Sequence, residues 1–198
     1  MSNSLNAQHI STNLANYEAA RTGFFSLIVD NLNDLDAKGL IKASYTGDRA
    51  SAPASDRIQN AQEIIKLNVL TADVPHFELE TLQYKRGNEV VKFAGVPTFS
   101  SGSVKVDDVV GLDTKAILMA WQSLAYNVHT GKGGRMTDYK RRCTLIEYDQ
   151  TYTQVRSWDL YGCWIKTLSE DAFDKENDGK RAITATIEYD KAIMREAE

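Results

Sequence analysis

The sequence predicts a mainly β protein of the α+β class: an antiparallel β-barrel or sandwich with one flanking α-helix at about residues 112–127 and a long polar loop at about 43–61. Two observations predict this fold class. Many segments alternate apolar and polar residues with a period near two, which is typical of half-buried strands. The connections between these segments span about two to six residues, which leaves no room for the crossovers that parallel strands need.

Length and composition indicate a single globular domain, which we expect to cover residues 1–198 with an N-terminal arm at 1–22. The chain is 42% hydrophobic and 25% charged. Its formal net charge of −4 argues against a domain that binds nucleic acid by neutralising phosphates, since such domains are normally basic. No apolar run reaches the roughly 20 residues that span a bilayer, and the first residues lack the basic and apolar regions of a signal peptide. We therefore expect an intracellular product with no membrane span.

The N-terminal third contains one predicted strand and one unusual loop. Residues 24–32 (FFSLIVDNL) are apolar and β-prone, so we expect the first strand there. The polar residues before it, 2–21, are either a short helix or an arm. Residues 43–61 are rich in Ala, Ser, Asp and Arg and have almost no apolar side chains. Such a loop cannot bury itself against a core, and structureless loops of this length are usually functional or disordered.

The middle of the chain contains a run of predicted strands, which alternate apolar and polar residues. They cover residues 63–74, 77–87, 86–95 and 102–111. Gly87 and Asn88 stand between two of these runs and predict a hairpin turn. In the last run, Val104 and Val106, followed by Val109 or Val110, mark one face.

One segment, at 112–127, follows a helical rather than a β pattern. Its apolar side chains recur at helical spacing, at Ile117, Trp121, Leu124 and Val128, with Leu118 and Ala125 beside them. Asp113 is a natural N-cap, because its carboxylate can accept hydrogen bonds from the first turn. The GKGG sequence at 131–134 then predicts the end of the helix.

The last third returns to strand patterns, at 141–149, 154–168 and 180–192, with a polar stretch at 169–180 before the last of them. The alternation is clearest in the final segment. Ile183, Ala185 and Ile187 are predicted to face one way, and Thr184, Thr186 and Glu188 the other.

The chain offers no recognisable catalytic or metal-binding set. Cys143 and Cys163 fit no zinc spacing, and the three histidines lie in separate segments. We expect Cys143 and Cys163 to be small buried side chains with free thiols. A disulfide between them would require that the two strands carrying them face each other. Asp107 and Asp108 are adjacent on a strand and point to opposite faces. The GKGG turn lacks the spacing of a phosphate-binding loop. We therefore predict no catalytic residue, no metal and no cofactor, and do not expect an enzyme.

The densest aromatic stretch is WDLYGCWIK at 158–166. On a regular strand, one face would carry Trp158, Leu160, Gly162 and Trp164, and the other Asp159, Tyr161, Cys163 and Ile165. A strand with two apolar faces is expected where both faces are covered, by the core on one side and by a helix or another subunit on the other. A glycine among large rings suggests a bulge or a close backbone approach. A site that stacks a sugar or a base on these rings would normally also have polar side chains nearby to bind the ligand. Arg156 is the one such side chain close in sequence, which is weak support for a stacking site.

Several stretches together carry a resemblance to a known family. They are NYEAARTGFFSLIV near the start, VPHFELETLQYKRGNEVVKFAGVPTFSSGSVKVDDVVGLDTKAILMAWQSLAYN in the middle, and DYKRRCTLIEYD, VRSWDLYGCWIKTLSEDAFD and RAITATIEYD at the end. The most specific pieces are the GN…VKFAG hairpin, the VDD…G strand end before the helix, and the W-x-L-x-G-x-W strand. From about Asn16 to Asp190, the sequence resembles the major tail tube proteins of contractile-tailed bacteriophages, the T4-like tail tube superfamily.

The resemblance implies a structural virion protein that is made in the host cytoplasm and resides in the tail. Six copies would form a ring, and rings would stack into a hollow tube whose lumen is lined by the joined inner sheets. A long loop or hairpin and the N-terminal segment would reach the adjoining ring. The implied partners are further copies of the chain, the tail sheath protein, and the baseplate and tail terminator proteins. Phage DNA would pass through the lumen without specific binding, helped by a mildly acidic wall.

The candidate subunit-interface residues come from the arm, the polar loop and the aromatic strand. They are Tyr17, Arg21, Tyr45, Asp48, Arg49, Arg57, Trp158, Tyr161 and Trp164. Two alternatives remain open at this point. The first is the inner tube subunit of a type VI secretion system or of a phage-derived injection system. The second is a carbohydrate- or peptide-binding β-sandwich that uses the two tryptophans.

Overall fold

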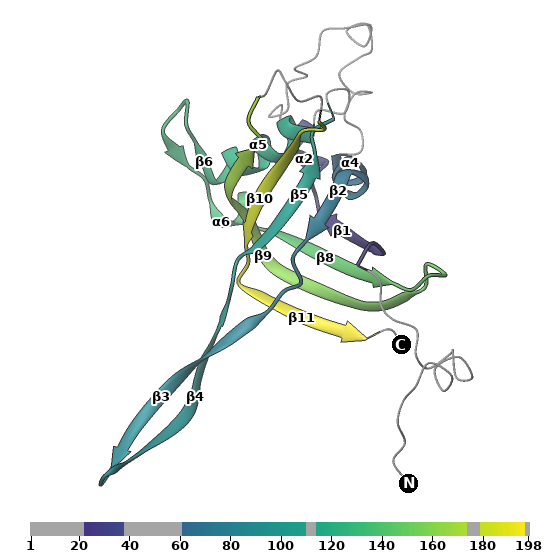
Figure 1. The fold of residues 1–198 in the computed structure, drawn as a ribbon. Helices are drawn as coiled ribbons and strands as arrows, with labels where there is room; N and C mark the ends of the chain where they lie inside the picture. The colour runs from purple at the N-terminus through teal and green to yellow at the C-terminus, as the bar shows by residue number, and fades with distance from the viewer. Residues whose placement is uncertain (1–21, 38–60, 110–113, 174–178, 197–198) are drawn as a thin grey trace, which may run out of the picture.

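The computed structural model describes residues 22–37, 61–109, 114–173 and 179–196, which form a β-sandwich from which one long hairpin projects (Figure 1). Antiparallel sheets face each other across the core and are not closed into a barrel. The predicted mainly β fold class is therefore confirmed, and of its two architectures the sandwich is the one observed. Within the described ranges, no helix is long and apolar enough to cross a membrane.

Each layer of the sandwich is an antiparallel sheet, and one strand belongs to both. The first layer, here called the β1 sheet, consists in spatial order of β1 (Phe25–Val29), β8 (Arg141–Tyr148), the N-terminal half of β9 (Gln154–Glu170) and β11 (Lys191–Glu196). The second layer, here called the β2 sheet, consists of β2 (Val69–Ala72), β5 (Gly102–Asp107), β10 (Ala182–Glu188) and the C-terminal half of β9. The predicted strands at 24–32, 102–111, 141–149 and 154–168 are confirmed.

A bend at Gly162 lets β9 pass from one sheet to the other. Gly162 has φ of +71°, and an added Cβ there would lie 2.1 Å from Oδ2 of Asp190, so glycine is required. The Asp190 N–H donates a 2.9 Å hydrogen bond to the carbonyl of Tyr161. Lys140 Nζ donates to both carboxylate oxygens of Asp190, at 2.8 and 2.7 Å. The close approach predicted at this glycine is confirmed.

The bend also changes which side chains of β9 face the core. Leu160 is buried before the bend, whereas Cys163 and Ile165 are buried after it. The sequence placed Leu160 on the same face as Trp164 and opposite Cys163 and Ile165. That assignment is wrong, because the left-handed backbone at Gly162 shifts the alternation of side chains.

The core lies between the two sheets and continues beneath the helices. Its largest fully buried side chains include Trp121, Leu32, Leu35, Ile117, Ile165 and Ile183. The predicted inward-facing side chains of β5 and β10 are buried, namely Val104, Val106, Ile183, Ala185 and Ile187. Cys143 and Cys163 are free, buried thiols on adjacent strands. A hydrogen bond with Cys163, together with burial, raises the pKa of the Cys143 thiol well above its ordinary value.

The described residues contain more helices than the one that the sequence predicts. They are α2 (Asp34–Ala37), α4 (Ala61–Asn68), α5 (Thr114–Ala125) and α6 (Met136–Tyr139). The predicted flanking helix is α5, which packs against β9 and donates a 2.9 Å hydrogen bond from Trp121 Nε1 to the carbonyl of Tyr139. Its predicted N-cap, Asp113, lies outside the described residues.

Helix α5 ends earlier than the sequence suggests. It stops at Ala125, and Val128, which the helical spacing included, is 83% exposed. The chain continues into a small hairpin formed by β6 (Tyr126–Asn127) and β7 (Lys132–Gly133). Asn127 Oδ1 accepts hydrogen bonds from two backbone N–H groups of the turn. The prediction that residues 131–134 terminate the helix is wrong, because they belong to this hairpin.

Two other predicted strands differ from the structure. The first half of the strand predicted at 63–74 is helix α4, since Ala61 and Ile65, four positions apart, both turn into the core. The strand predicted at 180–192 is divided at Asp190, where the chain turns from β10 to β11. The two parts pair with different halves of β9, so a single straight strand was the wrong prediction.

Candidate assembly surfaces

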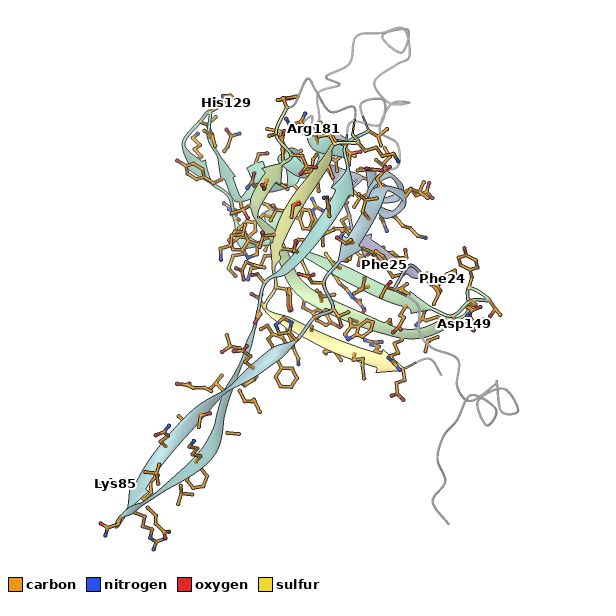
Figure 2. All side chains as sticks on the ribbon, in the orientation of Figure 1. Phe24, Phe25, Lys85, His129, Asp149 and Arg181 are labelled. Carbon is orange, nitrogen blue, oxygen red and sulfur yellow. The ribbon has the colours of Figure 1, made fainter. Side chains whose placement is uncertain are left out.

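The most exposed part of the described structure is the hairpin of β3 (Phe77–Arg86) and β4 (Glu89–Phe99), which extends far from the sandwich (Figure 1). The strands predicted at 77–87 and 86–95 and the turn between them are confirmed, with Gly87 at φ of +65°. The two strands pair only with each other among the described strands, and every residue of β3 is exposed. Side chains project from both sides of the hairpin, with Lys85 near its far end (Figure 2).

The hairpin carries large apolar side chains that the described chain leaves uncovered. Phe77, Leu79, Leu82, Tyr84, Val90, Val91, Phe93 and Val96 are each between 42% and 69% exposed. A lone two-stranded hairpin is at best marginally stable in water. Apolar surfaces of this extent usually mark an interaction site. The hairpin is therefore a candidate interaction surface.

Cross-strand pairing divides these side chains into two patches. The base patch contains the pairs Phe77–Phe99 and Leu79–Pro97, and the tip patch contains the pairs Leu82–Phe93 and Tyr84–Val91. Successive side chains of a strand point to opposite faces. Because Phe77 and Leu79 are odd-numbered while Leu82 and Tyr84 are even-numbered, the two patches lie on opposite faces of the hairpin.

A bulge separates the base patch from the tip patch. The register shifts between Leu79 and Thr81, so that Gly95 and Val96 both stand opposite Glu80. A Cβ on Gly95 would lie 2.9 Å from the carbonyl oxygen of Glu80 and 3.2 Å from Cγ of Leu82. Glycine therefore permits the close approach that this bulge requires.

Both sheets of the sandwich also have unpaired margins. In the β2 sheet, the outer strands are β2 and the C-terminal half of β9, and in the β1 sheet they are β1 and β11. Across the part of the chain that the structure describes, no further strand pairs with these outer edges. An open edge presents free N–H and C=O groups and is a template for pairing with another chain.

The outer faces of the two sheets differ in chemistry. The outer face of the β2 sheet carries hydroxyl side chains at Thr71, Ser103, Thr167, Ser169, Thr184 and Thr186, together with Lys105 and the Lys166–Glu188 ion pair. We call this surface the hydroxyl face. The outer face of the β1 sheet instead carries three isoleucines, Ile28, Ile146 and Ile193, around a cluster of charges.

The charge cluster on the β1 sheet is centred on Asp159, which is only 4% exposed. Its carboxylate oxygens lie 2.9 Å from Arg142 Nη2 and 2.8 Å from Arg195 Nε. The hydrogen bond with Asp159 raises the pKa of Arg142, and the Arg142 guanidinium also lies over the ring of Tyr161 at 5.4 Å. The cluster ties together β8, β9 and β11, one residue from each strand.

The structure describes three of the nine interface residues that the sequence suggests. Tyr17, Arg21, Tyr45, Asp48, Arg49 and Arg57 lie outside the described residues, as does the rest of the loop at 43–60. Trp158 packs partly against the core and lines a cleft with Phe24 and Phe25. Trp164 makes an edge contact with Tyr139 at 6.1 Å. Trp158 and Trp164 thus have different neighbours on either side of the bend, which does not favour a common ligand-stacking site. The hairpin patches were not among the candidates.

Within the described ranges, no group of three or more His, Cys, Asp and Glu side chains is arranged to hold a metal ion.

The sequence matches a protein family, and the fold resembles those of solved structures. The family model for the T4-like virus tail tube protein gp19 matches residues 62–192. No curated protein sequence matches the chain. A chain of the PVC extracellular contractile injection system, from its sheath–tube complex in the extended state, has 14% sequence identity and a TM-score of 0.60, with 98% of this chain and 100% of that chain covered.

Two further solved structures have the same fold. A chain from the PVC sheath/tube terminator in the extended state has 12% identity and a TM-score of 0.59, with 90% of this chain and 97% of that chain covered. A chain from the tube-terminating cap of the anti-feeding prophage has 12% identity and a TM-score of 0.58, with 91% and 93% covered.

Proposed function

This chain belongs to the family of T4-like virus tail tube proteins, and we propose that its copies close into six-membered rings that stack as the hollow tube of a contractile tail. As a member of this family it is a structural tube subunit and a tail component of a phage-like particle. The observation that carries the proposal is the family match over residues 62–192, which spans the hairpin, α5 and most of both sheets. The number of copies in a ring rests on the family resemblance.

Strand direction supports ring closure. Within each sheet all neighbours are antiparallel, so the two outer strands run in opposite directions. The free edge of β2 in one copy can therefore pair antiparallel with the free edge of β9 in the next copy. A contact between two different edges is heterologous, and it forms a ring when the rotation closes. Closure also removes the exposed edges that would otherwise favour aggregation.

The hydroxyl face is the surface that fits the lumen. A wall that lets phage DNA pass should offer few cations to phosphates and no apolar patch, since each phosphate contact adds to affinity. Among the described residues of this face, Lys105 lies beside the row of hydroxyls, and the charge of Lys166 is paired with Glu188 at 2.7 Å. The outer face of the β1 sheet, with its isoleucines and arginines, fits a protein partner better. The row of hydroxyls suits weak, non-specific contact with DNA, and the acidic wall that the sequence suggests stays a prediction.

Tail sheath, baseplate and terminator proteins are the further partners that we propose. Support comes from the fold shared with chains of a sheath–tube complex, a sheath/tube terminator and a tube-terminating cap. The same likeness favours one second candidate, a tube subunit of a phage-derived injection particle that carries other cargo. We propose no catalytic activity for the chain, in keeping with a family of structural tube proteins.

Negative-stain microscopy of the purified chain tests the proposed function. We expect rings or hollow tubes at high protein concentration, and a chain that stays monomeric under all such conditions would contradict the proposal.

Cysteine labelling of assembled tubes tests the lumen assignment, using the fact that the native thiols are buried. Thr186→Cys should react with a small maleimide but not with one attached to a large polymer. Ile193→Cys on the other sheet should react with the polymer. The opposite pattern would place the other sheet at the lumen.

A further inference from the structure

We propose that Tyr189, which directly follows β10, is a latch that fixes the direction in which the β3–β4 hairpin projects from the sandwich. The hairpin direction would then be set in the single subunit, before any partner binds. This inference goes beyond the proposed function, because it concerns the single subunit and does not require that copies assemble.

The hairpin joins the sandwich at a place where the strand pairing is interrupted. One leg of this joint, residues 73–76, connects β2 to β3, and the other leg, residues 100–101, connects β4 to β5 (Figure 1). Neither leg belongs to a strand, and Pro75 in the first leg has no N–H to donate. Because a few residues outside regular strands can absorb large changes of backbone angle, the joint could act as a hinge unless other contacts fix it.

Two hydrogen bonds hold the legs together where they leave the sandwich. The Asp73 N–H donates to the carbonyl of Ser103 at 2.9 Å, and the Ser103 N–H donates to Oδ2 of Asp73 at 2.8 Å. Both bonds lie on the sandwich side of Pro75. They therefore fix the start of the joint and leave the direction of the hairpin beyond it to other contacts.

Tyr189 supplies contacts to both legs beyond these hydrogen bonds. Its ring lies 6.0 Å from the ring of Phe99, the last residue of β4, and Phe99 in turn lies 5.9 Å from Phe77 across the hairpin. The backbone of His76, in the first leg, donates a hydrogen bond to the Tyr189 hydroxyl. Aromatic pairs stabilise beyond the area that they bury. One side chain of the sandwich thus holds the first leg and the start of the hairpin together.

Tyr189 is itself held firmly in the sandwich. It is 6% exposed and belongs to the buried core. The next residue, Asp190, donates its N–H to the carbonyl of Tyr161 at 2.9 Å and accepts two hydrogen bonds from Lys140. These contacts lie at the bend of β9, so the latch is fixed to the place where the two sheets meet.

A small rotation at the joint has a large effect at the far end of the hairpin. The ten residues of β3 span about 34 Å, so a rotation of about 10° moves the tip by about 6 Å. A projecting element whose direction is set in advance loses less conformational freedom when it binds. Tyr189 is therefore a positioning residue for the exposed apolar side chains of the hairpin, although it is itself buried.

Distance measurement between two spin labels by pulsed electron paramagnetic resonance tests the latch in the unassembled subunit. One nitroxide is attached at Asn88→Cys in the hairpin turn and the other at Thr167→Cys on β9, since both positions are exposed and the native thiols are buried. We expect one narrow distance distribution for the parent chain. Tyr189→Leu removes the ring contact and the hydroxyl, so the distribution should become at least about twofold broader.

A second variant keeps the test decisive if Tyr189→Leu does not fold. Phe99→Leu removes the partner ring from the hairpin side and should broaden the distribution in the same way. Tyr126→Leu is the matched control, because Tyr126 is a 56% exposed tyrosine on the separate β6–β7 hairpin. A parent distribution as broad as that of the variants would overturn the latch, and so would a narrow distribution in folded Phe99→Leu.

A label pair within the sandwich separates loss of the latch from general loosening of the fold. Labels at Gln154→Cys and Thr167→Cys both lie on β9 and should give the same narrow distribution in every variant. Broadening of this pair together with the hairpin pair would overturn the assignment of Tyr189 as a latch. A parent chain that never forms rings would contradict the proposed function, whereas these distances test the single subunit.

Discussion

The sandwich and the β3–β4 hairpin are two regions of one chain that obtain their stability in different ways. In the sandwich, side chains such as Val29, Val106 and Ile117 are at most 1% exposed, because the two sheets and α5 cover them. In the hairpin, Phe93 and Val96 are 56% and 69% exposed. Strands in both regions alternate apolar and polar side chains, but only the strands of the sandwich have their apolar side chains buried by the rest of the described chain. The sandwich therefore buries its own apolar side chains, while the hairpin leaves its apolar side chains exposed to other molecules.

Removing the central aromatic side chain of the sandwich should have the largest effect. Trp121 is 2% exposed and donates its indole N–H to the carbonyl of Tyr139. Trp121→Ala leaves a cavity, and we expect it to lower the free energy of unfolding by about 3–5 kcal/mol. Urea denaturation of the unassembled subunit measures this. The matched variant Phe93→Ala on the hairpin should change unfolding by less than about 0.5 kcal/mol, and a comparable loss in both variants would break the distinction.

A substitution at the bend of β9 should have the next largest effect on the free energy of unfolding. In Gly162→Ala, the new Cβ meets the Asp190 carboxylate, and alanine must adopt a φ of +71°. We expect a loss of about 2–3 kcal/mol in the free energy of unfolding. Gly133→Ala is the control, because nothing lies within 4 Å of a Cβ added there. Equal stability of the two variants would show that the bend at Gly162 tolerates a side chain.

The charge cluster on the β1 sheet should contribute less than the corner. In Asp159→Asn the size of the side chain is retained but the pairing with Arg142 and Arg195 is lost. Both arginines are about half exposed, at 45% and 59%, so solvent screens the interaction. We expect a loss of about 1 kcal/mol at low salt, and a smaller one in 1 M salt. A loss that does not depend on salt would indicate a packing effect instead, and Lys132→Gln serves as the neutral control.

The pattern of the sequence predicts which residues form strands better than it predicts what covers them. Val104 and Val106 in β5 and Leu82 and Tyr84 in β3 follow the same alternation, but the first pair is buried and the second is exposed. Alternation indicates that one face is apolar, and it does not say whether the chain itself covers that face. Strand length is one feature that distinguishes the projecting hairpin from the sandwich. Strands β3 and β4 have 10 and 11 residues, whereas β2 in the sandwich has 4.

The places where sequence reasoning failed have identifiable causes. The segment at 61–72 contains several apolar residues, which suggested a strand. Its first part is a helix, in which the buried residues Ala61 and Ile65 are four positions apart. The prediction for β9 assumed that side chains alternate regularly along the whole strand, so it missed the shift at Gly162. The glycine among large rings did correctly indicate a close backbone approach there. The interface prediction at Trp158 and Trp164 stays a prediction, and aromatic density alone did not indicate the exposed apolar side chains of the hairpin.

The smallest expected effect on stability is at the hairpin tip. Tyr84 is 63% exposed, so Tyr84→Ser should change the free energy of unfolding of the isolated subunit by less than about 0.5 kcal/mol. The same change removes an aromatic anchor from the tip patch, and aromatic side chains dominate interface energetics. We therefore expect assembly, measured by sedimentation and microscopy, to fall while urea denaturation stays unchanged. A serine variant that unfolds earlier than the parent would mean that the tip stabilises its own subunit, and the contrast between the two regions would no longer hold.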